Sequence, residues 1–140
     1  AAFLFAQLEA ADDLTARRLA VWQRYHEALA PLEAADHLAR PVIPPDCQQN
    51  AHMYYVVLKA AGLRDRVLAA LNALGIGAVF HYVPLHDSPA GQRFGRVAGS
   101  LPNTERAGAC LLRLPLWIAL GDQQDAVIAR LFEVVAAEAR

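Results

Sequence analysis

The decisive stretch of this sequence reads Gly75-Ile76-Gly77-Ala78-Val79-Phe80-His81-Tyr82-Val83-Pro84-Leu85-His86-Asp87. Its first half predicts the end of a helix at Gly75 followed by a buried strand over residues 76–82, because glycine favours the position after a helix and β-branched or aromatic side chains favour strands. Its second half is a loop crowded with hydrogen-bonding side chains. Loops positioned by a rigid scaffold commonly carry function, so we expect the functional site at this loop.

The neighbouring segments predict what this stretch packs against. Residues 64–74 place four apolar side chains on one helical face: Val67, Leu68, Leu71 and Leu74. Residues 51–59 are dense in aromatic and β-branched residues and predict a central strand. This order of strand, helix and strand predicts an α+β fold of two layers, with helices packed on a small, mostly antiparallel sheet.

Further elements flank this unit on both sides. Residues 1–29 carry apolar side chains at helical spacing and predict one long helix, bent near residues 12–15. Prolines bracket or interrupt two apolar runs, which predicts short edge strands over residues 39–43 and 111–116. A last helix is expected after Asp122 as its cap, with a buried stripe of Val127, Leu131, Val134 and Val135.

The segment that follows the decisive stretch is long and irregular. Residues 84–102 contain three glycines, and we expect one helical turn within them, over residues 89–94. Irregular loops of this length tend to be functional or mobile. Asn103 or Thr104 is then expected to cap a helix that ends near Cys110.

The composition is more apolar than that of an average domain. Of 140 residues, 56% are hydrophobic and 19% are charged, whereas soluble domains average about 45–50% apolar and about 25% charged residues. This charge deficit predicts an apolar surface that another domain or subunit covers. The sequence also begins without methionine and enters helical periodicity at once, so we expect the chain to be part of a longer protein.

Charge and cysteine content exclude several classes of partner. The formal net charge is −1 and the isoelectric point is about 6.6, which favours neither a nucleic acid nor an anionic membrane surface. No apolar run approaches the roughly 20 residues needed to cross a bilayer. Cys47 and Cys110 lie far apart without metal-type spacing, which is typical of reduced thiols in a cytoplasmic protein.

His81, Tyr82 and His86 are the first candidate site residues, because they follow the predicted strand within six residues. Strand alternation sends His81 and Tyr82 to opposite faces unless the strand ends between them. Together with His52 these histidines raise the question of a zinc site, but their spacing matches no strong metal motif, and we predict no metal. A packed His-Tyr pair and a contact with a small molecule both remain open.

Asn50, His52, Tyr54 and Tyr55 form a second candidate group, which can line a polar pocket. The alternative is that both tyrosines are half-buried strand residues with hydrated hydroxyl groups. Neither cysteine has a histidine beside it in the sequence, so a nucleophilic role is not predicted. The pair Gly75 and Gly77 lacks the third glycine of a dinucleotide-binding loop and precedes a strand, not a helix.

These residues form the motifs of a known family. Residues 75–86, then Ser88-Pro89-Ala90-Gly91, Leu101-Pro102-Asn103-Thr104-Glu105-Arg106 and Leu112-Arg113-Leu114-Pro115-Leu116, resemble the C-terminal part of DegT/DnrJ/StrS-type aminotransferases, which use pyridoxal phosphate (PLP) and act on nucleotide sugars. The resemblance covers nearly the whole chain. It implies that residues 1–140 are the C-terminal small domain of a fold-type I enzyme, with residues 1–29 as the helix that leaves the large domain.

The resemblance also implies an activity. Such enzymes transfer an amino group from glutamate, through PLP, to C4 of a dTDP-4-keto-6-deoxyhexose in the synthesis of lipopolysaccharide and common antigen sugars. The large domain supplies the PLP site and its Schiff-base lysine, and Lys59, the single lysine here, stands in a different context. We therefore expect no catalytic residue in this segment, which is inactive alone, and a homodimeric parent enzyme. The alternative is a non-catalytic dimerisation or regulatory module derived from the family.

The resemblance finally assigns roles to the candidate residues. The loop after the second strand faces the nucleotide sugar in this family, so His81 is expected to contact the substrate, with Tyr82 and His86 beside it. A neutral imidazole and a phenol can bind sugar hydroxyls or a phosphate oxygen without a fixed charge. Further residues are expected to line the same cleft, namely Asn50, His52 and Tyr54.

Overall fold

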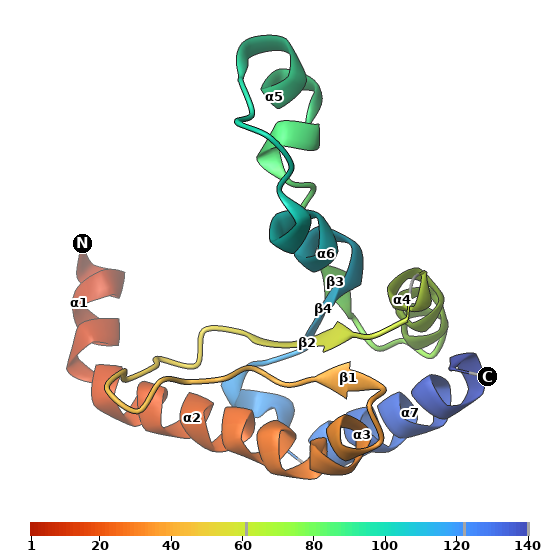
Figure 1. Cartoon of the computed structure of the whole chain (residues 1–140). Coiled ribbons are helices and arrows are strands. Elements are labelled where there is room, and N and C mark those ends of the chain that lie inside the picture. The colour runs from red at the N-terminus through yellow and green to blue at the C-terminus, as the bar shows by residue number, and fades with distance from the viewer. Residues whose placement is uncertain (61, 122, 140) are drawn as a thin grey trace.

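The fold is known here from a computed structural model, which describes residues 1–60, 62–121 and 123–139. Over these residues the chain forms a four-stranded antiparallel sheet with the strand order β1-β2-β4-β3 (Figure 1). The strands are β1 (Leu38–Ala39), β2 (Tyr54–Leu58), β3 (Val79–Phe80) and β4 (Leu111–Leu114). A small antiparallel sheet with helices packed on it confirms the predicted α+β class.

Helices make up most of the remaining structure. They are α1 (Ala2–Glu9), α2 (Ala11–Ala28), α3 (Ala30–Ala34), α4 (Leu63–Ala73), α5 (Pro89–Phe94), α6 (Pro102–Cys110) and α7 (Gln123–Glu138), with short 3₁₀ turns at Leu85–Asp87 (η1) and Ile118–Leu120 (η2). In Figure 1, α2, α3 and α7 run along the lower side of the sheet. No helix in the described part of the chain combines the length and the apolarity that crossing a membrane requires.

The core lies on one face of the sheet. Side chains alternate along β2 and β4, so this face receives Tyr54, Val56, Leu58, Leu112 and Leu114, each at most 5% exposed. Helices α2, α4 and α7 cover it with buried residues that include Trp22, Tyr25, Val67, Leu71, Leu131 and Val135. Burial of each large aliphatic side chain contributes about 1.5–3 kcal/mol. The strand predicted over residues 51–59 is confirmed at Tyr54–Leu58, the helix predicted over residues 64–74 is confirmed at Leu63–Ala73, and the stripe of α7 is buried as predicted. Leu74, which was expected on the apolar face of α4, follows the helix and is 51% exposed.

Helix α4 ends where the decisive stretch begins. The backbone N–H of Ile76 donates to the carbonyl oxygen of Leu71, and that of Gly75 donates to Asn72, both at 3.0 Å. This pair of bonds is the Schellman motif, which needs a left-handed residue after the helix. Gly75 supplies it with a φ of 76°. The glycine therefore turns the chain from α4 toward β3.

Strand β3 is shorter and more exposed than predicted. It has two residues, lies at the sheet edge beside β4, and its side chains are 43% and 45% exposed. The prediction of a buried strand over residues 76–82 is therefore wrong. A tight turn precedes the strand, since the N–H of Ala78 donates to Ile76 at 2.7 Å, and Tyr82 ends the extended backbone with a φ of 57°.

The predicted edge positions are half correct. β4 lies inside the sheet, between β2 and β3, so the expected edge strand over residues 111–116 is wrong. Pro115 follows β4 and does not interrupt it, so every residue of the strand keeps its N–H group for pairing. β1 does lie at an edge, but it covers residues 38–39 and not 39–43, because Pro41 has no N–H to donate to a ladder.

The first 29 residues form two main helices and not one. The chain breaks at Ala10, with φ −101° and ψ 7°, slightly before the expected bend at residues 12–15. Trp22 and Tyr25 bury one side of α2, whereas α1 has no buried residue. Packing against the core therefore fixes the direction of α2. The described residues of α1 make no such packing contact with the core, so α1 is not held in line with α2.

The helix starts differ in detail from the prediction. Helix α5 covers the predicted turn, and its cap Ser88 accepts a hydrogen bond from the N–H of Gly91 at 3.0 Å. Helix α6 begins at Pro102, so Asn103 and Thr104 lie inside it and do not cap it. The short helix α3 was not expected. Asp122, the expected cap of α7, lies outside the described residues.

Arg40 ties α2 to α3 and β1. Its backbone N–H and its Nε donate to the Glu33 carboxylate at 2.8 and 2.7 Å, and its Nη1 donates to the carbonyl oxygen of His26. His26 stacks on Trp22 with ring centroids 4.6 Å apart. Burial lowers the pKa of His26 below its usual 6.5, and the charge of Arg40 lowers this pKa further.

This corner makes stability depend on pH. The folded pKa of His26 lies below the unfolded value of about 6.5, so the unfolded state takes up a proton first as the pH falls. We expect the melting temperature to fall as the pH decreases below about 6.5, and His26→Gln to flatten this slope. Thermal unfolding followed by circular dichroism measures it, with His37→Gln as the control. An equal slope in wild type and His26→Gln would contradict the assignment.

Candidate functional site

The face of the sheet opposite the core is only partly covered. Tyr55, Arg113 and Val79 form one row across β2, β4 and β3, because directly paired residues point to the same side. Tyr55 and Arg113 are half-buried and Val79 is exposed. We call this side of the sheet the open face. Four of the predicted site residues line hollows near the two ends of this row, namely Asn50, His52, His81 and Tyr82.

A hollow that we call the connector pocket lies at the β2 end. It has a volume of about 620 Å³ and is lined by residues 48–53 together with Trp22, Pro41, Ile43 and Tyr55. Asn50 and His52 both belong to it. The Asn50 side-chain oxygen lies 3.2 Å from both the backbone N and Nδ1 of His52. The structure therefore brings these two predicted residues together.

The adjacent tyrosines of β2 point in opposite directions. Tyr55 lines the connector pocket, whereas Tyr54 is fully buried and stacks on Tyr25 with ring centroids 5.2 Å apart. The Tyr54 hydroxyl has no hydrogen-bond partner among the described residues, and burial raises its pKa well above the usual range. Tyr54 therefore lies beneath the connector pocket, in the core, and does not line it.

A second hollow, the His81 pocket, lies beyond β3. It has a volume of about 140 Å³ and is lined by residues 81–84 and by Thr104, Ala107, Gly108 and Leu111. The rings of His81 and Tyr82 meet edge to face with centroids 5.5 Å apart. His81 Nδ1 is buried without a hydrogen-bond partner in the described chain, and Tyr82 is 70% exposed. The pocket thus offers one unused polar atom beside an accessible phenol.

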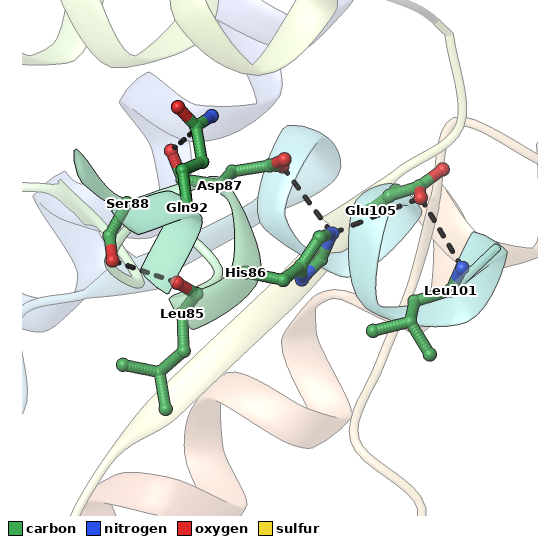
Figure 2. A network of polar contacts seen from close by, with 7 residues as sticks. All are labelled: Leu85, His86, Asp87, Ser88, Gln92, Leu101 and Glu105. Atoms are coloured by element: carbon green, nitrogen blue, oxygen red, sulfur yellow. Dashed lines mark hydrogen bonds and ion pairs between the residues drawn. The ribbon is translucent and has the colours of Figure 1, made fainter. Parts of the chain in front are cut away.

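His86 occupies a different position, in η1, where its side chain faces Glu105 of α6. Its Nε2 lies 3.6 Å from the Asp87 carboxylate and 3.9 Å from the Glu105 carboxylate, and its side chain is 15% exposed (Figure 2). Glu105 also accepts a hydrogen bond from the N–H of Leu101 at 3.3 Å. When the imidazole is protonated, both contacts are ion pairs. His86 therefore joins the long loop to α6 and does not line the His81 pocket.

The predicted residues thus fall into separate places. Asn50 and His52 lie in the connector pocket, His81 and Tyr82 in the His81 pocket, and the two pockets share no lining residue. Arg113, which sequence reasoning missed, lies between them, with its guanidinium carbon 5.7 Å from the centre of the Tyr82 ring. The available signal was a single charged residue inside a strand of leucines.

The metal-ligating side chains of the described residues are dispersed. No group of three histidine, cysteine or carboxylate side chains in residues 1–60, 62–121 and 123–139 has the geometry to hold a metal ion. Lys59 lies 3.2 Å from the Asp36 carboxylate and lines neither pocket.

Comparison with known proteins places this geometry in a family. A sequence profile described as the DegT/DnrJ/EryC1/StrS aminotransferase family matches residues 1–132. The dTDP-3-amino-3,4,6-trideoxy-alpha-D-glucose transaminase of Micromonospora megalomicea subsp. nigra is 33% identical over 138 residues, which are 96% of this chain and 36% of that protein. The chain therefore spans about a third of the length of this curated relative.

Solved structures agree with the sequence match. The aminotransferase TlmJ from Streptoalloteichus hindustanus is 31% identical with a TM-score of 0.83, over 96% of this chain and 35% of that one. DesV from S. venezuelae, in complex with a ketimine intermediate, is 31% identical with a TM-score of 0.82, over 99% of this chain and 36% of that one. The fold and the sequence thus each match about a third of the length of these proteins.

The His81 pocket depends on a close contact that a mutation can test. A Cβ atom added at Gly108 of α6 would lie 2.7 Å from Cγ of Pro84, so Gly108→Ala must push the loop away. We expect a net destabilisation of about 1 kcal/mol, because overpacking costs about 1–3 kcal/mol and alanine gains about 1 kcal/mol in a helix. Urea unfolding measures it. Gly77→Ala, where no atom lies within 4 Å, is the control; a more stable Gly108→Ala protein would contradict the contact.

Proposed function

Because the chain belongs to the DegT/DnrJ/EryC1/StrS aminotransferase family, we propose that it is the C-terminal small domain of a PLP-dependent sugar-nucleotide aminotransferase. Its match to about a third of each relative supports a small domain of a larger enzyme. In this proposal residues 1–140 form the small domain, and α1 with α2 leads out of the large PLP-binding domain. The parent enzyme is a cytoplasmic homodimer.

The exposed apolar surface supports a covering domain. Phe3 is 91% exposed and Leu4, Phe5 and Leu8 are each at least 60% exposed. All four lie on the short helix α1. Contiguous exposed apolar residues of this kind mark an interaction surface. The large domain of the same enzyme is the proposed cover, and this accounts for the low charge content.

PLP is the proposed cofactor, and the large domain is proposed to hold it. The ketimine intermediate in the DesV structure supports this cofactor. When bound, PLP acts as the electron sink that lets an amino group move between substrates. Lys59, which pairs with Asp36, is proposed to have no part in this chemistry. The segment alone is therefore expected to be inactive.

The unused Nδ1 of His81 is the observation that carries the proposed role of this chain. A buried polar atom without a partner costs about 1–3 kcal/mol, and a substrate hydroxyl or phosphate oxygen in the His81 pocket satisfies it. The exposed Tyr82 phenol adds a second donor beside it. His86 fixes the loop against α6 and contributes indirectly.

The connector pocket is the proposed second contact with the nucleotide sugar. Asn50 and His52 present an amide and an imidazole there, and both can donate and accept hydrogen bonds. Tyr54 supports these residues from the core beneath them. The two pockets together bind and orient the sugar nucleotide, and they leave the transfer of the amino group to the cofactor side of the enzyme.

The proposed reaction moves the amino group of glutamate to C4 of a dTDP-4-keto-6-deoxyhexose. The product is dTDP-4-amino-4,6-dideoxygalactose, a precursor of lipopolysaccharide and common antigen sugars. The Micromonospora relative is named for a sugar whose amino group is at C3. A 3-keto-6-deoxyhexose linked to dTDP is therefore the second candidate substrate.

An assay of the full-length protein tests this reaction. We expect the protein that contains this chain, supplied with PLP and glutamate, to convert dTDP-4-keto-6-deoxyglucose to the 4-amino sugar, as identified by mass and NMR. The 3-keto isomer in a parallel reaction decides the position of the amino group. No product from either sugar would contradict the proposal and favour a dimerisation or regulatory module.

Mutation of His81 tests the role of the His81 pocket. Loss of one or two hydrogen bonds is expected to raise KM for the keto-sugar about 5- to 20-fold in His81→Ala, with KM for glutamate changed less than about twofold. Steady-state kinetics of the full-length protein with each substrate varied in turn measures both constants. His37→Ala, near the far edge strand, is the matched control. Equal effects on both substrates would assign His81 a structural role.

A further inference from the structure

Arg113 is an unusual residue at the centre of the open face. It lies on β4, directly paired with Tyr55 of β2 and Val79 of β3. Its neighbours Leu112 and Leu114 point to the opposite side, where they are buried in the core. An arginine at an inner position of a sheet needs a reason, because charged side chains are almost never fully buried unless they are paired, and the Nε of Arg113 is buried.

The guanidinium of Arg113 lacks a polar partner. Its Nε is buried and makes no hydrogen bond within the described chain. The guanidinium carbon lies 5.7 Å from the centre of the Tyr82 ring, which holds the group by a cation–π contact but satisfies none of its donors. An unsatisfied donor on a charged group costs more than one on a neutral group, so the site is incomplete without an acceptor.

The surroundings of Arg113 join the two pockets. On one side its strand neighbour Tyr55 lines the connector pocket beside His52. On the other side Tyr82 lines the His81 pocket, where His81 also has a buried nitrogen without a partner. Neighbouring strands lie about 4.8 Å apart, so the row of Tyr55, Arg113 and Val79 is short enough for one small molecule to span.

We propose that Arg113 binds an oxyanion of the substrate, either a phosphate or a carboxylate group, on the open face between the connector pocket and the His81 pocket. An arginine suits this role because its fork of donors matches two oxygens at once. The Tyr82 ring fixes the plane of the guanidinium. This inference rests on the proposed function, since a nucleotide sugar carries phosphates and an amino donor such as glutamate carries carboxylates.

Two probes separate the possible sources of the oxyanion. The nucleotide dTDP carries the phosphates of the nucleotide sugar without its hexose. Glutarate carries both carboxylates of the amino donor without its amino group. Isothermal titration of each probe into the full-length protein gives its Kd. We expect Arg113→Gln to weaken one of them about 10- to 100-fold and Arg113→Lys to weaken the same probe less. A change for dTDP assigns the phosphate, and a change for glutarate assigns the carboxylate.

Arg130→Gln is the matched control. Arg130 is exposed on α7, in the helical layer, and pairs with Glu133 of the same helix. It should leave both Kd values unchanged. Circular dichroism and the melting temperature show whether each variant is folded, and Arg113→Lys keeps the charge if Arg113→Gln does not fold.

Each contrary outcome overturns the inference in a recognisable way. Folded Arg113 variants that bind both probes as wild type does would show that Arg113 binds no substrate oxyanion. Failure of the wild-type protein to bind either probe would overturn this inference and the proposed function together. Unchanged binding by the variants alone would leave the proposed function standing.

Discussion

The structure depends on the antiparallel pairing of β2 with β4. Tyr54 pairs with Leu114 and Val56 with Leu112, which brings together segments more than 50 residues apart in the chain. Because the side-chain period of a strand is two, this register decides every residue's face. It sends the leucines and Tyr54 to the core and sends Tyr55 and Arg113 to the open face. A slip by one residue would bury the arginine among the helices.

Local patterns predicted the elements whose formation is local. The apolar face of α4, its glycine-dependent end at Gly75 and the stripe of α7 each need only a window of neighbouring residues, and all were predictable. The order of the strands was not predictable from local patterns. β4, which was expected at an edge, pairs with β2 and lies inside the sheet, and this leaves β3 at the edge. The break at Ala10 has no local signal either, since it depends on the absence of packing around α1.

The candidate site was predicted in its residues better than in its arrangement. The sequence pointed to Asn50, His52, His81 and Tyr82, and all four lie at the margins of the open face. It named Tyr54 for the cleft, whereas Tyr54 is buried in the core and Tyr55 lines the connector pocket. Alternation alone fixes the relative but not the absolute directions of the two side chains. Arg113 was missed because Pro115 made residues 111–116 a predicted edge strand, in which an arginine would simply face solvent.

The backbone of Tyr82 explains how the pockets and Arg113 become one surface. Continued alternation after β3 would have separated His81 from Tyr82, but the strand ends at Phe80 and Tyr82 adopts a φ of 57°. This left-handed geometry costs about 1–3 kcal/mol for a residue other than glycine and persists only where surrounding contacts hold it. Here those contacts are the edge of His81 and the guanidinium of Arg113 on the same ring. The strained residue thus contacts both His81 and Arg113, each of which has a buried nitrogen without a hydrogen-bond partner among the described residues.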